Sequence, residues 1–219
     1  MESSFYARYG KRIFDIISSL IVLIIISPLL LAIALLIKLS DKGPIFFSQS
    51  RIGQSFKPFN LLKFRTMVVN ADKMGPSITS KDDPRITKMG RLLRKAKLDE
   101  FPQLLNVLKG DMSLVGPRPE VERYVRIFRN DYEDILKVKP GITDYAAIEF
   151  RDEEAVLRRY DNPEEAYVNE VLPKKISFYK KYICEISFFT DIKLIFITFN
   201  KVITGVAERT ASGSNIHSS

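Results

Sequence analysis

The sequence contains only one cysteine, Cys184, and one histidine, His217, among its 219 residues. A single cysteine excludes a disulfide within the chain, and one residue of each kind cannot build the usual Cys/His zinc site. A bound metal would therefore take oxygen ligands, which suit hard ions such as Mg²⁺ or Mn²⁺. The cysteine count is compatible with a reducing compartment, and no internal repeat is evident.

Acidic residues are scarce relative to basic ones, because 26 Asp and Glu stand against 34 Lys and Arg, which gives a net charge of +8. This imbalance predicts attraction to nucleic acid, to an acidic membrane surface or to phosphorylated substrates. The basic residues are dispersed and are not interleaved with stacking aromatic residues, so the pattern does not indicate a nucleic-acid-binding module. The length suffices for one compact domain with appended segments.

Between Ile13 and Leu39 the chain is almost wholly apolar. At ~1.5 Å per residue, a helix over this stretch exceeds a hydrocarbon core of ~30 Å. The stretch is too long for a cleavable signal peptide, and no small-residue cleavage pattern follows it. Pro28 removes an amide donor and crowds the carbonyl of Ile24, so we expect a kink, with the Ser27 hydroxyl as a local partner for the freed backbone.

Basic residues flank this apolar stretch on both sides, so the positive-inside rule assigns no orientation. The geometry that places both flanks in the cytoplasm is a re-entrant helical hairpin within residues 1–42, broken at Ser27-Pro28. A kinked helix that spans the bilayer is the alternative. We expect residues 43–205 to form a cytoplasmic domain with amphipathic interfacial helices, and residues 206–219 to form a disordered tail.

Two short strands are predicted after a turn at Gly43-Pro44, over residues 45–48 and 59–67. Alternation of side chains places Lys63 and Arg65 on one face of the second strand. Two cations that project together could bind phosphate. The alternative is that they protect an edge strand from pairing with other chains.

The triplet Asp82-Asp83-Pro84 predicts the start of a helix that runs from Arg85 to Ala96. Apolar residues repeat at helical spacing there, and basic residues, with Arg85 among them, fill the remaining turns. Such a helix either lies on an anionic surface or is an ordinary amphipathic helix with a solvated side.

Asp99 and Glu100 stand at the predicted start of the next helix, which Gly110 closes. Free backbone amides at a helix N-terminus stabilise a carboxylate, so Asp99 would stay ionised and available as a nucleophile or a metal ligand. The alternative interpretation is ordinary helix capping.

Arg118 lies between Pro117 and Pro119, which fix the backbone on both sides of it. A pre-positioned guanidinium binds phosphate in a bidentate manner at a lower entropic cost, so the pattern predicts an anion clamp. The alternative is a proline-rich turn whose arginine points into solvent.

The predicted fold class is α+β, mostly helical with a small β-hairpin or sheet. Residues 151–182 read as two or three short helices interrupted by Pro163 and Pro173. Residues 185–204 are predicted to form a helix that lies either in the core or in a membrane interface.

Taken together, the segments resemble the bacterial sugar transferases called monotopic phosphoglycosyl transferases, and are most similar to their small, single-module members. The resemblance extends from about Lys11 to Thr143. It rests on Lys11-Arg12-Ile13-Phe14-Asp15, Ser27-Pro28, Gly43-Pro44, Gln49-Ser50-Arg51-Ile52-Gly53, Lys63-Phe64-Arg65-Thr66-Met67, Leu98-Asp99-Glu100, Asn106-Val107-Leu108-Lys109-Gly110-Asp111-Met112-Ser113 and Gly116-Pro117-Arg118-Pro119. One departure is Asp144, where the family usually has glycine after Pro-Gly-Ile-Thr.

The resemblance implies a two-step transfer of a sugar 1-phosphate from a UDP-sugar to a polyprenyl phosphate such as undecaprenyl phosphate, with release of UMP. Asp99 would be the nucleophile that holds the phosphosugar covalently, and Glu100 would bind Mg²⁺, with Mn²⁺ as the other candidate. Lys63 and Arg118 match positions that contact phosphate or nucleotide. Three further arginines complete the predicted set of substrate-binding cations: Arg65, Arg85 and Arg151.

The resemblance also implies a place in the bacterial inner membrane, with the catalytic domain on the cytoplasmic face and the reaction as the first membrane step of glycoconjugate assembly. The expected partners are the UDP-sugar, the polyprenyl phosphate and membrane lipid, without nucleic acid, and a homodimer is one possible assembly. Two rival functions remain: a membrane-anchored protein that binds anionic lipid, and a metal-dependent lipid phosphatase.

Overall fold

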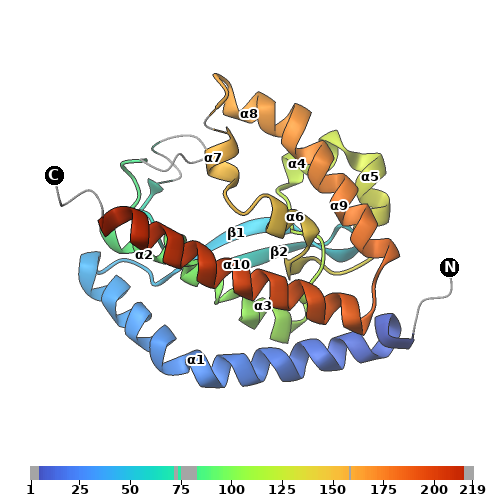
Figure 1. The fold of residues 1–219 in the computed structure, drawn as a ribbon, viewed down its shortest axis with the longest axis horizontal. Coiled ribbons are helices and arrows are strands. Elements are labelled where there is room, and N and C mark those ends of the chain that lie inside the picture. Colours follow the sequence, from blue (N-terminus) through green and yellow to red (C-terminus); the bar gives the residue numbers. More distant parts are fainter. Residues whose placement is uncertain (1–4, 72–73, 75–82, 158, 215–219) are drawn as a thin grey trace.

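The computed structural model describes residues 5–71, 74, 83–157 and 159–214. The described part is mostly helical, and Figure 1 shows one long helix along the lower edge of a compact body. The helices are η1 (Tyr6–Gly10), α1 (Lys11–Asp41), η2 (Gln54–Phe56), α2 (Lys88–Ala96), η4 (Leu98–Glu100), α3 (Gln103–Lys109), α4 (Glu122–Ile127), α5 (Arg129–Ile135), α6 (Tyr145–Glu149), α7 (Glu153–Leu157), α8 (Pro163–Ala166), η5 (Tyr167–Val171), α9 (Leu172–Cys184) and α10 (Phe188–Ser214).

The strands form two small sheets within the described residues. The predicted hairpin is present as β1 (Phe46–Ile52) and β2 (Pro58–Phe64), which pair antiparallel with Phe46 opposite Phe64. A second pair, β3 (Ser113–Val115) and β4 (Gly141–Thr143), is parallel and was not predicted, because three-residue strands leave no periodic pattern to detect. The expected class, mostly helical with a small sheet, is confirmed in this coarse form.

Helix α1 is a single helix of 31 residues that continues through Pro28. Pro28 cannot donate a backbone hydrogen bond to the carbonyl of Ile24, and the hydroxyl of Ser27 donates to that carbonyl instead, at 2.9 Å. Figure 1 shows that α1 changes direction part of the way along its length. The structure thus has one bent helix where we expected two helices of a hairpin, and the expected role of the Ser27 hydroxyl is confirmed.

The two arms of α1 contact the same domain. In the first arm, the guanidinium of Arg12 donates to the carbonyls of Val107 and Leu108, in the last turn of α3, at 2.5 and 2.9 Å. Asp15 in the same arm accepts from the backbone amide of Leu114 at 3.1 Å. In the second arm, apolar side chains pack against β2 and α2, in a cluster of buried residues formed by Ile33, Ile37, Phe64 and Leu93.

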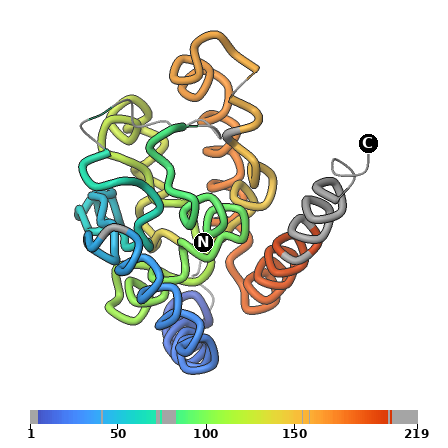
Figure 2. The backbone as a smooth tube through the Cα atoms, turned by 90° about the vertical axis from the view of Figure 1, so that its left-hand side faces the viewer, coloured from blue at the N-terminus to red at the C-terminus, as the bar shows by residue number. Residues whose placement is uncertain are grey.

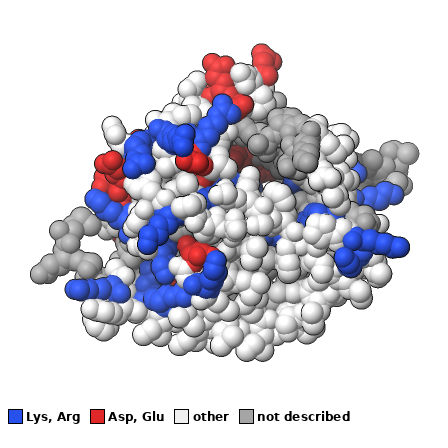
Figure 3. All heavy atoms as spheres, turned by 180° about the vertical axis from the view of Figure 1, so that it is seen from behind, with Lys and Arg blue, Asp and Glu red and all other residues white. Residues whose placement is uncertain are grey.

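Between these contacts, α1 exposes a continuous apolar surface. It is the one helix among the described residues that is long and apolar enough to cross a membrane. Its exposed large side chains are Ile13, Ile16, Ile17, Leu20, Ile21, Ile24, Ile25, Leu29, Leu31, Leu35, Leu36 and Leu39. Figure 3 shows this lower edge almost without charge, with lysine and arginine gathered above it toward each end. Such a surface needs an apolar environment to cover it.

Helix α10 begins beside the first arm of α1, and Figure 2 shows the two helices diverging from there. The buried carboxylate of Asp191 fastens this end, because it accepts from Tyr6 and Lys11 at 2.6 Å each and from Tyr182 at 2.8 Å. The outer side of α10 leaves Phe189, Ile192, Phe196 and Phe199 exposed at helical spacing. The tail predicted for residues 206–219 is helical as far as Ser214, and residues 215–219 lie outside the described part.

Helix α2 starts later than predicted, because the residues before it have other partners. Ile86 forms an isolated antiparallel bridge with Met67, and Asp83 forms an ion pair with Arg85 at 2.6 Å rather than capping the helix. The N-cap is Thr87, whose side chain accepts from the amide of Gly90. The predicted start at Asp83 and Pro84 is therefore wrong, and Asp82 lies outside the described residues.

Candidate active site

The Asp99-Glu100 pair lies on a short 3₁₀ turn, η4, between the end of α2 and the start of α3. Helix α2 is held close to the chain before it, since a Cβ added at Gly90 would lie 1.9 Å from the carbonyl oxygen of Thr66. The helix then ends at Lys97 in a left-handed conformation (φ 57°), which turns the chain sharply into η4. The close packing of Gly90 and the turn at Lys97 thus fix the backbone that leads into the acid pair.

Glu100 is held by two cations from distant parts of the sequence. Arg118 donates to both carboxylate oxygens of Glu100, at 2.5 and 3.2 Å, and Lys63 of β2 donates to Oε1 at 3.0 Å. Burial acts to raise the pKa of Glu100, but Arg118 and Lys63 outweigh it and hold the pKa well below its usual value. Glu100 is therefore an anion at neutral pH, and its side chain is still 15% exposed.

Asp99 is buried, and its Oδ1 atom has no hydrogen-bond partner among the described residues. Burial and then the charge of Glu100 raise the pKa of Asp99, while Lys63, Lys97 and Arg94 act to lower it. A buried carboxylate oxygen without a partner is costly for stability and is common where a group must react or bind. Asp99 thus differs from a routine helix cap, which would use its oxygens on backbone amides.

The loop that carries Arg118 is fixed by the β3–β4 pair. The amide of Gly116 donates to the carbonyl of Thr143 at 2.9 Å, and the amide of Gly141 donates to the carbonyl of Pro117 at 2.9 Å. The two glycine backbones are so close that a Cβ added at Gly141 would lie 2.1 Å from the amide nitrogen of Gly116. Because Arg118 directly follows these contacts, its approach to Glu100 is set by the sheet.

Asp144 supports the same loop. It is fully buried and accepts from the amide of Arg118 at 3.3 Å and from the amide of Ala147, at the start of α6, at 2.6 Å. Burial raises the pKa of Asp144 to about 6. The Asp144 side chain is therefore part of the support for Arg118.

A second set of charged side chains lies behind the loop and is centred on Glu120. This carboxylate is 4% exposed and accepts from Tyr167 at 2.6 Å, from Lys175 at 3.1 Å and from Arg51 at 3.5 Å. Lys175 also donates to Glu153 at 3.0 Å. We call Arg51, Glu120, Glu153, Tyr167 and Lys175 the Glu120 network. It fixes the chain immediately after Arg118, since Arg51 also donates to the carbonyl of Pro119 at 3.2 Å.

Three other predicted cations have different partners. Arg65 donates through Nε to the carbonyl of Pro44 at 2.5 Å and so fastens the turn before β1. The guanidinium of Arg85 pairs with Asp83 and donates to the carbonyl of Ala71 at 2.9 Å. Arg151 donates to the carbonyls of Lys201 and Val202 in α10. Of the predicted set, Lys63 and Arg118 are the ones with hydrogen bonds to Glu100, and substrate contact by the other three stays a prediction.

Sequence reasoning missed several residues that act on the site. The charges of Lys97 and Arg94 both act on Asp99, yet both residues fall in a run of basic residues that reads as a solvated helix face. Asp144 and Lys175 were missed because their partners lie 26 and 55 residues away in sequence. Only the fold brings them to the Arg118 loop.

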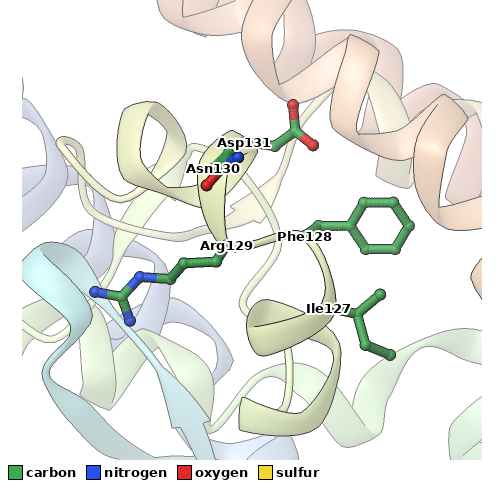
Figure 4. Close-up of a pocket in the computed structure, with 5 residues that line it drawn as sticks. All are labelled: Ile127, Phe128, Arg129, Asn130 and Asp131. Carbon is green, nitrogen blue, oxygen red and sulfur yellow. The ribbon is translucent and has the colours of Figure 1, made fainter.

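A shallow pocket at the junction of α4 and α5 is a different feature. It is lined by Ile127, Phe128, Arg129, Asn130 and Asp131, and Figure 4 shows the Arg129 and Asp131 side chains pointing away from each other. Both charges have other partners, because Arg129 stacks over the ring of Phe56 and Asp131 pairs with Lys180 at 2.6 Å. Its lining includes neither the acid pair nor the two cations that hydrogen-bond Glu100.

An acid pair whose Glu100 is held by two cations, next to a helix long and apolar enough to cross a membrane, defines a class of site suited to phosphorylated ligands. The chain belongs to the bacterial sugar transferase family, whose model matches residues 6–205. The family expected from the sequence motifs is thereby confirmed.

Three curated relatives illustrate the likeness. The chain is 40% identical over 198 residues to the UDP-glucose:undecaprenyl-phosphate glucose-1-phosphate transferase of Escherichia coli (strain K12), covering 89% of this chain and 40% of the relative. It is 35% identical over 219 residues to the UDP-N-acetylgalactosamine-undecaprenyl-phosphate N-acetylgalactosaminephosphotransferase of Aeromonas hydrophila, covering 95% and 47%. It is 39% identical over 193 residues to the uncharacterized sugar transferase EpsL of Bacillus subtilis (strain 168), covering 88% and 87%. The chain thus spans less than half the length of the first two.

Proposed function

We propose that this chain is a phosphoglycosyl transferase that moves a sugar 1-phosphate from a UDP-sugar to undecaprenyl phosphate and releases UMP. The observation that carries the proposal is the buried Asp99, with an unpartnered oxygen, next to a Glu100 clamped by Lys63 and Arg118. The names of the relatives from Escherichia coli and Aeromonas hydrophila support the same reaction type, with glucose in one and N-acetylgalactosamine in the other.

In the first step, a carboxylate oxygen of Asp99 attacks the β-phosphorus of the UDP-sugar. The bond between that phosphorus and the bridging oxygen breaks, and UMP leaves with the bridging oxygen and its electron pair. In the second step, a phosphate oxygen of the lipid attacks the same phosphorus and frees the carboxylate of Asp99. Lys63 and Arg118 stabilise the negative charge that shifts between the phosphoryl oxygens in both steps.

Glu100 and Asp99 are the side chains that would hold a divalent cation. No group of three or more His, Cys, Asp or Glu that could hold a metal ion occurs within the described ranges. Two carboxylates, one with an unpartnered oxygen, nevertheless suit Mg²⁺, which often takes one or two carboxylates and completes its shell with water and substrate phosphates. When bound, Mg²⁺ would supply positive charge to the diphosphate.

We place the chain at the cytoplasmic face of the inner membrane, with α1 re-entering the bilayer so that both its ends lie on one side. This arrangement is supported by the contacts of both arms of α1 with the same domain. Cysteine labelling tests it in a Cys184→Ser background that carries either Ser3→Cys or Ser40→Cys. Both cysteines should react from the cytoplasmic side, and labelling from opposite sides would instead establish a spanning helix. Interfacial placement of α10 is supported by its exposed phenylalanines.

The reaction is tested by incubating the detergent-purified protein with a panel of UDP-sugars, Mg²⁺ and undecaprenyl phosphate while UMP release is followed. Asp99→Asn is the matched variant, because it keeps the shape of the side chain and removes the nucleophilic carboxylate. We expect one UDP-sugar to give UMP and a lipid-linked product with the wild type, and a loss of at least ~10³-fold with Asp99→Asn.

The products of the same incubation distinguish the proposed function from its two rivals. A lipid phosphatase would release inorganic phosphate from undecaprenyl phosphate without any UDP-sugar, and a lipid-binding protein would leave every UDP-sugar intact. Full activity of Asp99→Asn would remove this residue as the nucleophile.

A further inference from the structure

Lys97 occupies a position in the backbone where glycine is usual. It is the residue after α2, with φ 57°, and its amide donates to the carbonyls of Arg94 and Leu93 as in a helix C-cap. The equivalent position after α3 is Gly110, with φ 98°. A side chain in the left-handed region is strained, and residues with such strain are enriched at functional sites. Lys42 ends α1 in the same conformation, with φ 56°, so the feature that distinguishes Lys97 is its position two residues before Asp99.

The ammonium of Lys97 is exposed and forms no hydrogen bond or ion pair with any described residue. It nevertheless acts on the acid pair, because its charge lowers the pKa of both Asp99 and Glu100. Lys63 and Arg118 differ from it, since both already donate to Glu100. Lys97 is thus a cation near the nucleophile that has no partner in the described chain.

Lys97 also lies where the site meets α1. The next residue, Leu98, packs against the second arm of α1, in the cluster with Ile33 and Ile37. Arg118 approaches the acid pair from a different element, the loop after β3 that Asp144 supports. A phosphate carried by a lipid tail would follow the apolar surface of α1 to the site and would meet Lys97 at this boundary, whereas a water-soluble nucleotide has no need of that surface.

We propose that Lys97 binds the phosphate of the acceptor lipid and that it contributes little to binding of the nucleotide sugar. The proposal rests on the proposed function. When the lipid arrives, Asp99 carries the sugar phosphate as a negatively charged acyl phosphate, so a second phosphate brings further negative charge into the site. An unpaired ammonium on the membrane side offsets that charge and holds the attacking oxygen near the phosphorus.

The two-step reaction allows a direct test, because in ping-pong kinetics kcat/KM for each substrate reports on its own half-reaction. We expect Lys97→Met to lower kcat/KM for undecaprenyl phosphate about tenfold, the size of one lost charge-assisted hydrogen bond. For the UDP-sugar, kcat/KM should stay within about twofold of the wild-type value. The amount of UMP released in a single turnover without lipid should also stay unchanged. Lys97→Arg should restore most of the acceptor value.

Two variants control for misfolding and for a general loss of positive charge. Lys97→Gly removes the ammonium and also relieves the left-handed backbone, so a loss shared by Lys97→Met and Lys97→Gly cannot come from misfolding. Lys88→Met removes an exposed lysine from the other end of α2 and should behave as the wild type. Equal losses for both substrates, or no loss for the lipid, would overturn the proposal. Absence of Asp99-dependent UMP release in the wild type would instead overturn the proposed function.

Discussion

Glu100 and Glu120 are both carboxylates held by cations, and the short segment from Arg118 to Glu120 joins their surroundings. Glu100 pairs with Lys63 and Arg118 at a partly exposed position, next to an Asp99 oxygen that has no partner among the described residues. Glu120 is 4% exposed and receives hydrogen bonds from Tyr167, Lys175 and Arg51. The chemistry of the two groups is similar, but access to them differs.

The difference indicates how the fold divides its charges between binding and support. A buried ion pair with additional hydrogen bonds is costly to break, because one removed partner leaves an uncompensated charge. A partly exposed cluster beside an unpartnered carboxylate can exchange its partners for a ligand. We therefore interpret the Glu100 cluster, formed by Lys63, Asp99, Glu100 and Arg118, as the reactive centre. The Glu120 network is then the scaffold that positions Arg118 next to Glu100.

The sharpest test of this comparison exchanges each glutamate for glutamine. Glu100→Gln should reduce turnover about 100-fold or more, because it removes the charge that orients Lys63 and Arg118 and the proposed metal ligand. Its free energy of unfolding should also fall, because Lys63 and Arg118 lose their partner, but it should fall less than in Glu120→Gln, since the Glu100 side chain is 15% exposed and Glu120 is 4% exposed. Glu120→Gln should show the opposite pattern, with lower stability and turnover per folded molecule within about fivefold. Steady-state kinetics and denaturant unfolding of both variants measure this, and similar profiles would break the comparison.

The next largest effect concerns Lys175. Lys175→Met leaves Glu120 and Glu153 without their shared cation, and we expect a loss of about 3 kcal/mol in the free energy of unfolding. Lys180→Met is the matched control on the same helix α9. It removes an exposed ion pair with Asp131 and should cost less than about 1 kcal/mol. Equal losses in thermal or denaturant unfolding would show that the network does not stabilise the fold as described.

A pH dependence follows from Asp144. Burial raises its pKa to about 6 from an ordinary value of 3.8, so the folded state holds the proton more tightly than the unfolded state does. Its contribution to stability is therefore present at low pH and is lost as the pH rises through about 6. The stability of the wild type relative to Asp144→Asn should fall by about 2 kcal/mol between pH 4.5 and 7.5. A difference that stays constant, or that rises with pH, would contradict this.

The smallest effect is expected at Lys97. Lys97→Gly should raise the free energy of unfolding by up to about 1 kcal/mol, because glycine adopts the left-handed conformation without strain. Lys97→Met, which keeps a side chain, should leave the stability unchanged. A lower free energy of unfolding for Lys97→Gly would indicate that the lysine side chain supports the turn. Lys97 would then have a structural role, unlike Lys63 and Arg118, the cations that hold Glu100.

Local patterns were sufficient to predict the apolar α1 and the β1–β2 hairpin, whereas they left Asp99 and Glu100 open between helix capping and catalysis, and the resemblance to a family favoured catalysis. Both predictions depend on signals within a few residues, which are the run of apolar residues for α1 and the turn at Gly43-Pro44 with short apolar runs for the hairpin. The same local reasoning set the start of α2 too early, because an acidic residue before proline is typical of a helix start. Here Asp83 is used by Arg85, and Ile86 pairs with Met67.

The supports of the site could not be predicted, because they join residues far apart in sequence. The β3–β4 pair joins two three-residue strands, and Lys175 reaches Glu120 across 55 residues. Charged residues at such positions look like ordinary surface residues until the fold buries them. The packing of both arms of α1 on one domain was likewise not readable from hydropathy.

The central claim, that Asp99 carries the phosphosugar, is tested most directly by mass spectrometry of the protein after incubation with the UDP-sugar that releases UMP, in the absence of lipid. We predict one added sugar-phosphate mass per chain, located by peptide mapping at Asp99, lost on addition of undecaprenyl phosphate and absent from Asp99→Asn. An adduct on another residue, or lipid-dependent turnover without any adduct under rapid quench, would contradict the claim.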